Sequence, residues 1–348
     1  MKNKQIVLAR RPNGKPVPED FALKLSDLPI PGEREALIEN MYISMDAGFR
    51  NWMDEGAGDA VLPAMPIGEA VMGLTVGRVV ASNHPDLVVG SILMGRLAWE
   101  SYSIATDAHF LVPIAAHYDQ PVSDHLGILG DTGMSAYFGL TDIGQIKEGE
   151  TVLVSAAGGA VGTVAGQLAK IMGARRVVGF AGTDAKCRWL EAEVGFDATI
   201  NYKRDDIESR LAEVCPDGVD VYFDNVGGEL LSPVLNHINQ GARIPFCGAV
   251  ADYANGGVAG PSNLFEIVKN WARLEGFMTH TKLDRYDEAR DALAGWLASG
   301  QLKKFEAKYY GVESCGQAFS DLFAGENYGK TIVQVAGDSG ASQGKDDV

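Results

Sequence analysis

The sequence predicts an α/β protein in which a doubly wound parallel sheet domain is joined to a second, mostly β domain. Three observations lead to this prediction. The chain has 348 residues, more than a single hydrophobic core usually supports. Roughly its first 120 residues contain short strand candidates separated by turns. After about residue 123, strand and helix candidates alternate, which is the pattern of a parallel sheet covered by helices.

The first region contains short segments of alternating polarity that are typical of strands. Strands are predicted at residues 36–44, 73–82, 90–94 and 101–104. Turn-forming dipeptides punctuate the region, and they include Asn13-Gly14, Pro31-Gly32 and His84-Pro85. The region is therefore predicted to be a small all-β unit.

The second region alternates between apolar strands and helices. A helical stretch from Ser123 to about Gly144 leads into the β-branched strand 151–154. A helix at 164–171, a strand at 176–180 and a helix that opens at Thr183 follow. The remaining predicted elements are strands at 220–224, 242–247 and 274–278 and helices near 203–215, 229–239 and 284–299.

Strands return in the last part of the chain. They are predicted at 308–310 and 330–335, with a helix at about 313–324 between them. We expect this segment to rejoin the first domain, which gives one domain of residues 1–128 with 303–348 and another of residues 129–302. The final residues, 338–348, are small and polar and are predicted to be disordered.

The composition limits the partners of the protein. Its net charge of −16 argues against nucleic acid and anionic membranes, because both bind basic faces. No apolar run reaches the length that spans a bilayer, and the amino terminus lacks the apolar run of a signal peptide. The four cysteines are far apart with no paired spacing, as is typical of reduced thiols, so we expect a cytoplasmic protein.

The segment Ala157-Gly158-Gly159-Ala160-Val161-Gly162 predicts a dinucleotide site. Positions 157, 159 and 162 have the spacing of the G-x-G-x-x-G fingerprint, with alanine in the first position. Gly159 lets the backbone approach a pyrophosphate, Gly162 permits close helix–strand packing, and the helix start offers N–H groups to the anion. A packing role alone is the alternative, but the strand before the motif and the helix and strand after it favour a dinucleotide.

The end of the following strand indicates which dinucleotide is bound. A site for NAD usually has a carboxylate there, which binds the ribose 2′-hydroxyl. Here the strand ends in Ala181-Gly182-Thr183, and Lys186 and Arg188 follow. Cations attract a 2′-phosphate, so NADPH is the predicted cofactor, although Lys186 could also be a solvated surface lysine. We expect Asp184 to interact with the helix dipole instead of a ribose.

The chain lacks the patterns of a metal enzyme or of a nucleophilic enzyme. Its six histidines form no pair at ligand spacing and its cysteines form no cluster, so no metal site is predicted. No serine elbow is present, and Cys247 is expected to pack at the end of a strand. A reaction that needs neither a metal nor a nucleophilic side chain is hydride transfer from NADPH to an activated alkene. Tyr253, just beyond a strand end, is the candidate that stabilises charge on the carbonyl oxygen of a small-molecule substrate; an exposed loop tyrosine is the alternative.

Several motifs resemble those of the medium-chain dehydrogenase/reductase superfamily. They are residues 42–46, 156–162, 201–203, 222–228, 247–249 and 327–331. Within the superfamily, the chain resembles the zinc-independent branch of prostaglandin reductases, plant alkenal double-bond reductases and bacterial curcumin reductase, most specifically through Asp224-Asn225-Val226-Gly227-Gly228. The resemblance implies a Rossmann domain, a GroES-like substrate domain, NADPH-dependent reduction of enals or enones, and a homodimer paired through the nucleotide domains.

The resemblance also implies which residues form the site. The segment Ala160-Val161-Gly162-Thr163 is expected to bind the pyrophosphate, and Lys186 and Tyr202 the 2′-phosphate. Tyr253 matches a tyrosine that borders the substrate. The rest of the implied nucleotide site consists of Asn225, Cys247, Gly248, Tyr253, Phe277, Met278, Thr279 and Asn327.

The chain departs from the family pattern at two places that bear on the substrate. Gly48 stands where the family usually has a tyrosine that lines the pocket, which implies a wider or differently polar pocket. Asp131 and Thr132 lie in a segment that usually reads Gly-Met-Pro-Gly, and they put an acid and a hydroxyl near the nicotinamide end. These departures keep open a quinone reductase or a carbonyl or alcohol dehydrogenase. A third hypothesis is an NADPH-binding protein without enzymatic activity.

Overall fold

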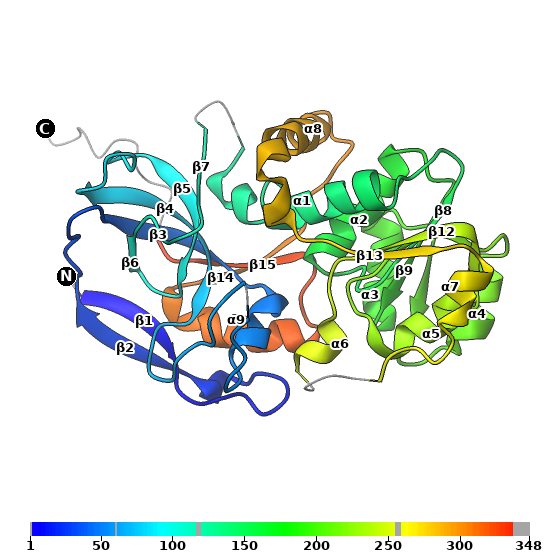
Figure 1. The fold of residues 1–348 in the computed structure, drawn as a ribbon, viewed down its shortest axis with the longest axis horizontal. Helices are drawn as coiled ribbons and strands as arrows, with labels where there is room; N and C mark the ends of the chain where they lie inside the picture. Colours follow the sequence, from blue (N-terminus) through cyan, green and yellow to red (C-terminus); the bar gives the residue numbers. More distant parts are fainter. Residues whose placement is uncertain (1, 60, 116–119, 255–258, 337–348) are drawn as a thin grey trace, which may run out of the picture.

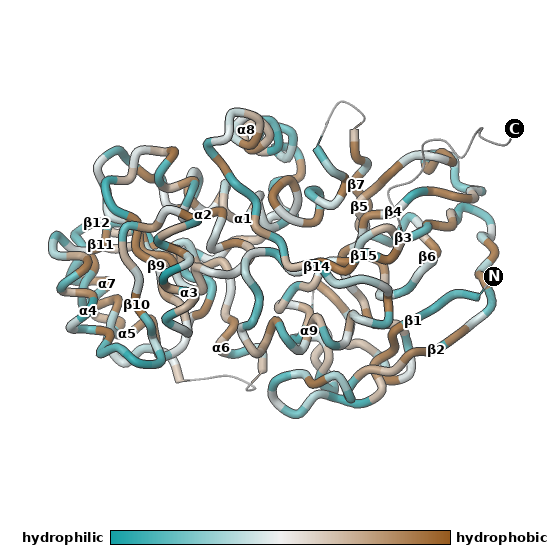
Figure 2. Tube along the Cα trace, turned by 180° about the vertical axis from the view of Figure 1, so that it is seen from behind, coloured by the Kyte–Doolittle hydropathy of each residue, from teal (hydrophilic) through white to brown (hydrophobic). Residues whose placement is uncertain are grey.

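The computed structural model describes residues 2–59, 61–115, 120–254 and 259–336, which form two lobes (Figure 1). One lobe contains the beginning and the end of the chain, and the other contains its middle. Figure 2 shows that hydrophobic stretches occur along many of the strands and in the inner parts of the lobes. The predicted fold class is confirmed. The predicted domain boundaries remain predictions, and the stretch predicted to be disordered lies outside the described residues.

The first lobe is built on a seven-stranded sheet of order β14-β15-β3-β4-β5-β7, in which β6 also pairs with β3. The strands are β3 (Ala36–Ser44), β4 (Met72–Ser82), β5 (Ile92–Ala98), β6 (Tyr102–Ala105), β7 (Leu111–Pro113), β14 (Glu306–Tyr310) and β15 (Lys330–Gln334). The pairing of β15 with β3 returns the end of the chain to the first lobe, as the sequence predicts. A helix, α9 (Cys315–Ala324), connects β14 to β15.

The same lobe contains a two-stranded ribbon that is not predicted from the sequence. It consists of β1 (Lys2–Leu8) and β2 (Phe21–Asp27), which pair antiparallel. In β2 only Phe21 is buried, whereas Leu23 and Leu25 are 51% and 60% exposed. Because β2 has no continuous buried face, its sequence lacks the signal by which a half-buried strand is recognised.

The second lobe is a six-stranded parallel sheet of order β10-β9-β8-β11-β12-β13. Its strands are β8 (Thr151–Val154), β9 (Arg176–Ala181), β10 (Ala198–Asn201), β11 (Val219–Phe223), β12 (Ile238–Phe246) and β13 (Arg273–Gly276). Five of them lie where the sequence predicts strands. The exception is β10, whose sequence Ala-Thr-Ile-Asn contains one large apolar residue and therefore lacks the apolar run that marks β8.

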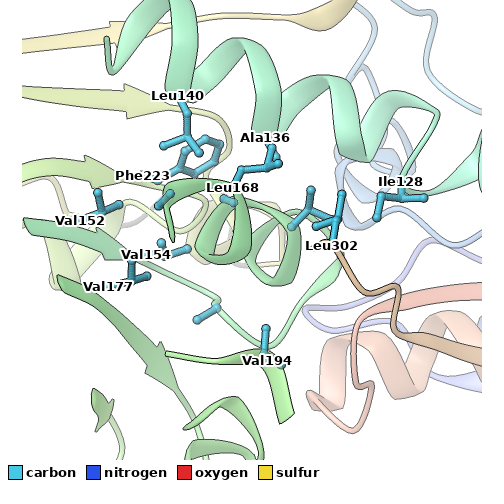
Figure 3. Packing of buried hydrophobic residues seen from close by; sticks show 14 of the residues in the cluster. Ile128, Ala136, Leu140, Val152, Val154, Leu168, Val177, Val194, Phe223 and Leu302 are labelled. Carbon is cyan, nitrogen blue, oxygen red and sulfur yellow. The ribbon is translucent and has the colours of Figure 1, made fainter. Parts of the chain in front are cut away.

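Helices cover both faces of this sheet. Val152 and Val154 belong to the core shared with α1, α2 and α8 (Figure 3), whereas Leu153 between them belongs to the core shared with α4 and α5. This alternation is the period of two that a strand imposes on its side chains. The helices of the lobe are α1 (Asp131–Phe138), α2 (Ala160–Ile171), α3 (Asp184–Trp189), α4 (Ile207–Val214), α5 (Leu231–Leu235), α6 (Val250–Tyr253), α7 (Phe265–Lys269) and α8 (Tyr286–Ala298).

Two predicted helices need correction. The helix predicted at 123–144 is divided into a 3₁₀ helix at Val122–Leu126, α1, and a π turn at Gly139–Ile143. A Cβ on Gly130 would stand 2.0 Å from the His125 carbonyl oxygen, so the chain turns too tightly for a helix before α1. The helix predicted near 229–239 ends earlier, because β12 already begins at Ile238.

Candidate functional site

The two central strands of the parallel sheet define a switch point. β8 and β11 are neighbours, although β9 follows β8 along the chain and β12 follows β11. The chain therefore leaves β8 and β11 in opposite directions, and open α/β sheets bind ligands at the carboxyl ends of such a pair. The predicted glycine turn follows β8, and the segment 224–228 follows β11. The fold thus brings both motifs to the same edge of the sheet.

The glycine turn has the geometry of an anion cradle. Gly159 precedes α2, so the first turn of that helix is Ala160-Val161-Gly162-Thr163, as expected for the pyrophosphate segment. The first N–H groups of a helix have no partner within the helix and can bind an anion. A Cβ on Gly162 would stand 2.4 Å from the Ala156 carbonyl oxygen, so only glycine allows α2 to approach the turn this closely.

Asp224 stabilises the turn after β11 through hydrogen bonds. Its Oδ1 accepts hydrogen bonds from the Ser155 hydroxyl (2.8 Å), the Tyr222 hydroxyl (3.0 Å) and the backbone N–H groups of Val226 and Gly227 (2.9 and 3.0 Å). Burial raises the pKa of the Asp224 carboxyl, and these donors counteract that rise. The carboxyl group holds together the two turns that flank the switch point.

Asn225 joins the same two turns. Its side-chain Nδ2 donates to the Ser155 carbonyl oxygen (2.8 Å), and its backbone N–H donates to the Ser155 hydroxyl (2.7 Å). Gly227 and Gly228 have φ values of +65° and +58°, which explains the two glycines of the motif. The sequence does not predict the roles of Ser155 and Tyr222. The one feature that could have indicated them is Asp224, a polar residue directly after a buried strand.

Two cations lie at the end of β9, where an NAD site would have a carboxylate. Lys186 is 8% exposed, and burial and the charge of Lys203 lower its pKa to about 8. A Cβ on Gly182 would stand 3.0 Å from the Tyr202 hydroxyl and 3.3 Å from Lys203 Cε. Lys186 and Tyr202, which were both predicted as ligands, therefore lie in the same region. Lys203, which was not predicted as a ligand, lies there as well. Two neighbouring cations favour an anion between them.

The other charged residues of α3 are engaged elsewhere. Asp184 accepts hydrogen bonds from Asn201 Nδ2 (2.6 Å) and from Arg204 Nη1 (2.5 Å), so it is an ion-pair partner as well as a residue of the first helical turn. Arg188 lines a separate cavity of about 420 Å³, of which neither Lys186 nor Tyr202 is a lining residue. The expectation that Arg188 assists Lys186 is therefore not supported.

A second cavity, of about 610 Å³, opens at the carboxyl ends of β12 and β13. Its lining includes five residues that the resemblance assigns to the nucleotide site, namely Cys247, Gly248, Tyr253, Phe277 and Met278. Burial raises the pKa of Cys247 to about 12, so its thiol stays protonated and packs, as predicted. Within the described residues, the cavity brings together two chain segments that are more than twenty residues apart in sequence.

Tyr253 is a cavity residue and not an exposed loop tyrosine. Its hydroxyl oxygen accepts a hydrogen bond from the Ala249 N–H (3.1 Å) and would stand 3.0 Å from a Cβ on Gly248. Burial raises the pKa of the Tyr253 hydroxyl. The hydroxyl is therefore protonated at neutral pH, and its hydrogen can be donated to a ligand oxygen.

Gly48 lies in a 3₁₀ helix, Ala47–Trp52, that packs against α6, the helix that ends at Tyr253. Nothing lies within 4 Å of the position that a Cβ on Gly48 would take. Because glycine has no side chain, the space beside Gly48 is open. Next to it, Asp46 accepts hydrogen bonds from the buried ammonium of Lys330 and from the Ser44 hydroxyl (2.5 Å).

Asp131 connects the first turn of α1 with the segment after β13. Its carboxylate accepts a hydrogen bond from the hydroxyl of Thr279, a residue of the implied nucleotide site. Burial and the nearby Asp46 raise the pKa of Asp131, whereas Thr279, Lys330 and His280 oppose the rise. The acid therefore lies where residues of both lobes meet. Its neighbour in the sequence, Thr132, is buried with 5% exposure, so a ligand reaches it only if its neighbours move.

Asn327 lies in a segment that returns to the glycine turn. The Gly329 N–H donates to the Gly158 carbonyl oxygen (2.9 Å), and Asn327 Nδ2 donates to the Gly329 carbonyl oxygen (3.0 Å). The structure thus places this predicted residue beside the dinucleotide motif, although the segment leads directly into β15 of the other lobe.

The described residues contain neither a group of metal-ligating side chains nor a helix suited to crossing a membrane. In the part of the chain that the structure describes, no three His, Cys, Asp or Glu side chains are grouped so that they could hold a metal ion. Among the same residues, no helix combines the length and apolarity that crossing a membrane requires. The predicted absence of a metal site remains a prediction for the whole chain.

The fold and the site define the class of the protein. NADPH fits the residues present, because the cradle at Gly162 excludes a Cβ and the end of β9 carries cations without a free carboxylate. A switch-point cradle of this kind, next to a cavity with a protonated tyrosine, is the arrangement of a dinucleotide-dependent oxidoreductase.

Comparison with known proteins gives the same class. Two family models match, the N-terminal domain of oxidoreductase at residues 4–114 and zinc-binding dehydrogenase at residues 160–295. The chain is 40% identical to the NADPH-dependent curcumin reductase of Escherichia coli, over 97% of this chain and 98% of the relative. It is 36% identical to the NADP(+)-dependent 2-alkenal reductase of Nicotiana tabacum, over 96% and 98%. The crystal structure of CurA from Vibrio vulnificus in complex with NADPH is similar with a TM-score of 0.87 and 36% identity, over 96% and 99%.

The chain belongs to the medium-chain dehydrogenase/reductase family, in the reductase branch that contains these relatives.

Proposed function

We propose that the protein uses NADPH to reduce the activated carbon–carbon double bond of a small enal or enone. The observation that carries this proposal is the pair of cations, Lys186 and Lys203, at the end of β9, on a chain whose full-length relatives are named as NADPH-dependent curcumin and 2-alkenal reductases. The proposal extends to the site residues that the family resemblance implies, and the contacts described above support it.

Different residues of this chain act at the two ends of the cofactor. When bound, NADPH supplies a hydride to the β-carbon of the substrate. The first turn of α2 holds the pyrophosphate, and Lys186 with Tyr202 holds the 2′-phosphate. The Tyr253 hydroxyl donates a hydrogen bond to the carbonyl oxygen, on which negative charge develops. A proton from solvent then adds to the α-carbon and completes the saturated product.

The substrate end of the site favours a bulky neutral acceptor. Open space at Gly48 leaves room for a larger substituent than a tyrosine would allow. Asp131 and Asp46 share the neighbourhood of one buried lysine, Lys330, so a further negative charge on the substrate is disfavoured. Phe277 and Met278 add apolar surface to the cavity.

Product analysis tests this function. Purified protein is incubated with NADPH and an enal, and the products are separated. The proposal predicts the saturated aldehyde, with one NADPH consumed for each alkene reduced, and the same rate in the presence of a metal chelator. An allylic alcohol as the main product would show carbonyl reduction instead, and NADPH binding without turnover of any acceptor would support a protein that only binds the nucleotide.

A second candidate function rests on one observation. Asp131, with its Thr279 hydrogen bond, is a carboxyl group that the related reductases usually lack at this place. A polar group there suits an acceptor with more than one oxygen, such as a quinone. Formation of a hydroquinone at a rate above that of enal reduction would favour this function.

We further propose a cytoplasmic homodimer. The four cysteines are free, which fits a reducing compartment. β13 is an edge strand of the parallel sheet, and the nearby α7 region exposes large apolar side chains, which are Leu264, Phe265, Val268, Trp271 and Leu274. Apolar side chains next to an open strand edge favour a second copy of the chain as the partner. Phe265→Glu is expected to yield monomers in analytical ultracentrifugation, and an unchanged mass would contradict the proposed surface.

A further inference from the structure

Lys186 makes two contacts with a segment of the chain that lies about 140 residues further on. Its Nζ donates to the Gly325 carbonyl oxygen (3.0 Å) and stands 5.3 Å from the centre of the Tyr328 ring. Its stem packs along the glycine turn, since a Cβ on Gly158 would stand 2.7 Å from Lys186 Cδ. A long, flexible side chain is therefore held in one place by a carbonyl oxygen, an aromatic face and a backbone turn.

The ring of Tyr328 is itself fixed from two directions. It meets Trp189 of α3 edge to face, with ring centroids 4.9 Å apart, and Trp189 meets Phe305 in the same manner at 5.0 Å. The next residue, Gly329, donates its N–H to the Gly158 carbonyl oxygen (2.9 Å). Tyr328 is thus tied both to the helix that carries Lys186 and to the turn over which Lys186 lies.

These contacts leave the ammonium free to serve a ligand. An ammonium has three N–H donors, and the Gly325 carbonyl oxygen uses one of them. Lys186 and Lys203 influence each other electrostatically, and a tyrosine face compensates part of the charge of a cation that has lost water. A group that is ordered before binding loses less conformational entropy when a ligand arrives.

We propose that Tyr328 is a positioning residue for cofactor selection, which holds Lys186 beside the glycine turn and thereby favours ligands that carry a 2′-phosphate. The inference rests on the proposed function, in which Lys186 contacts that phosphate. Tyr328 acts through Lys186. The proposed 2′-phosphate site therefore combines residues from the middle of the chain with a segment near its other end, since only Gly329 separates Tyr328 from β15 of the other lobe.

Calorimetric titration with two nucleotide fragments tests the inference. Adenosine 2′,5′-bisphosphate carries the 2′-phosphate, and adenosine 5′-monophosphate is the same fragment without it. Tyr328→Leu is expected to weaken binding of the bisphosphate about fivefold, and to change binding of the monophosphate by less than about twofold. Tyr328→Phe, which keeps the ring, is expected to bind both as the unmodified protein does.

Two further variants distinguish a failure of the role proposed for Tyr328 from a failure of the role proposed for Lys186. Tyr310→Leu is the matched control, because Tyr310 is 70% exposed on β14, and it should change neither affinity. If Lys186→Ala weakens bisphosphate binding but Tyr328→Leu does not, the positioning role of Tyr328 is wrong. Equal weakening of both fragments by Tyr328→Leu would also overturn it, since that result indicates a disturbed glycine turn. If Lys186→Ala itself has no effect, the proposed role of Lys186 and this inference fail together.

Discussion

The two ends of the site are built in different ways. The proposed nucleotide end begins with a backbone turn, a helix start and a strand end that follow one another between residues 151 and 186, and Lys203 and Tyr328 join it from later in the chain. The proposed substrate end is assembled from residues of remote segments, with Gly48 in one lobe, Asp131 and Tyr253 in the other, and Lys330 in the returning strand β15. The nucleotide end is also crowded at Gly162, whereas the space beside Gly48 is open. Local sequence patterns therefore indicate the cofactor, whereas the proposed substrate end depends on the tertiary arrangement.

The largest expected effect is at the crowded end. In Gly162→Ala the new Cβ would stand 2.4 Å from the Ala156 carbonyl oxygen, so the turn or α2 must shift. We expect a loss of more than about 2 kcal/mol in the free energy of unfolding and no measurable NADPH binding. Denaturant unfolding and calorimetry check both. Gly48→Ala is the control, because its Cβ meets nothing within 4 Å and should change stability by less than about 0.5 kcal/mol.

Lys186→Ala removes one of the two cations at the nucleotide end. We expect NADPH to bind about 30-fold more weakly, which corresponds to about 2 kcal/mol for a charge-assisted contact, with little change for NADH. Titrations with both nucleotides measure this difference. Arg188→Ala is the control on the same helix, because Arg188 lines a separate cavity. Equal losses for NADPH and NADH in Lys186→Ala would contradict a contact with the 2′-phosphate.

The affinity for NADPH should also depend on pH. Burial and Lys203 lower the pKa of Lys186 to about 8, so its ammonium is charged below that pH and loses its proton as the pH rises through it. Between about pH 7 and about pH 9 we expect NADPH affinity to fall about fivefold while NADH affinity stays nearly constant. Lys186→Arg should remove the dependence, because a guanidinium stays charged. A flat NADPH profile in the unmodified protein would count against the contact.

At the substrate end, Gly48→Tyr fills the open space with the side chain that the related reductases usually have. We expect a KM several-fold higher for bulky enones and little change for small enals, because only the larger acceptors need the space. The dissociation constant of NADPH should stay within about twofold. A uniform change in KM for all acceptors would show that Gly48 does not shape the pocket.

Asp131→Asn is expected to have the smallest effect. Burial and Asp46 raise the pKa of Asp131, so the protonated acid persists above its ordinary range, and asparagine resembles that neutral form. The two proteins should turn over within about twofold of each other at low pH. As the pH rises through the raised pKa, the unmodified protein gains a carboxylate at the proposed substrate end and should slow, whereas the variant should not. Parallel pH profiles of kcat would contradict this role.

The same contrast explains what could be predicted from the sequence. The glycine turn, Lys186 and the positions of most strands follow from local patterns, because a period of two, a β-branched run and a glycine spacing are visible along the chain. β10 and β2 were missed for local reasons as well, since β10 has one large apolar residue and β2 has no continuous buried face.

The parts that could not be predicted depend on contacts between remote residues. Lys203 and Tyr328 reach Lys186 only in the folded chain, and Ser155 meets Asp224 across two turns. Asp131 and Gly48 stood out only as departures from a family pattern, and the Thr279 hydrogen bond and the open space beside Gly48 became known from the structure. The role of Arg188 stays a prediction, since it lines a cavity to which Lys186 does not contribute.

The central claim is that hydride from NADPH reaches the β-carbon of an activated alkene, and isotope transfer tests it most directly. The protein is incubated with NADPH deuterated at C4 and an enal, and the product is analysed by nuclear magnetic resonance. We predict a saturated aldehyde with deuterium at the former β-carbon. Deuterium at the carbonyl carbon of an unsaturated alcohol would contradict the claim.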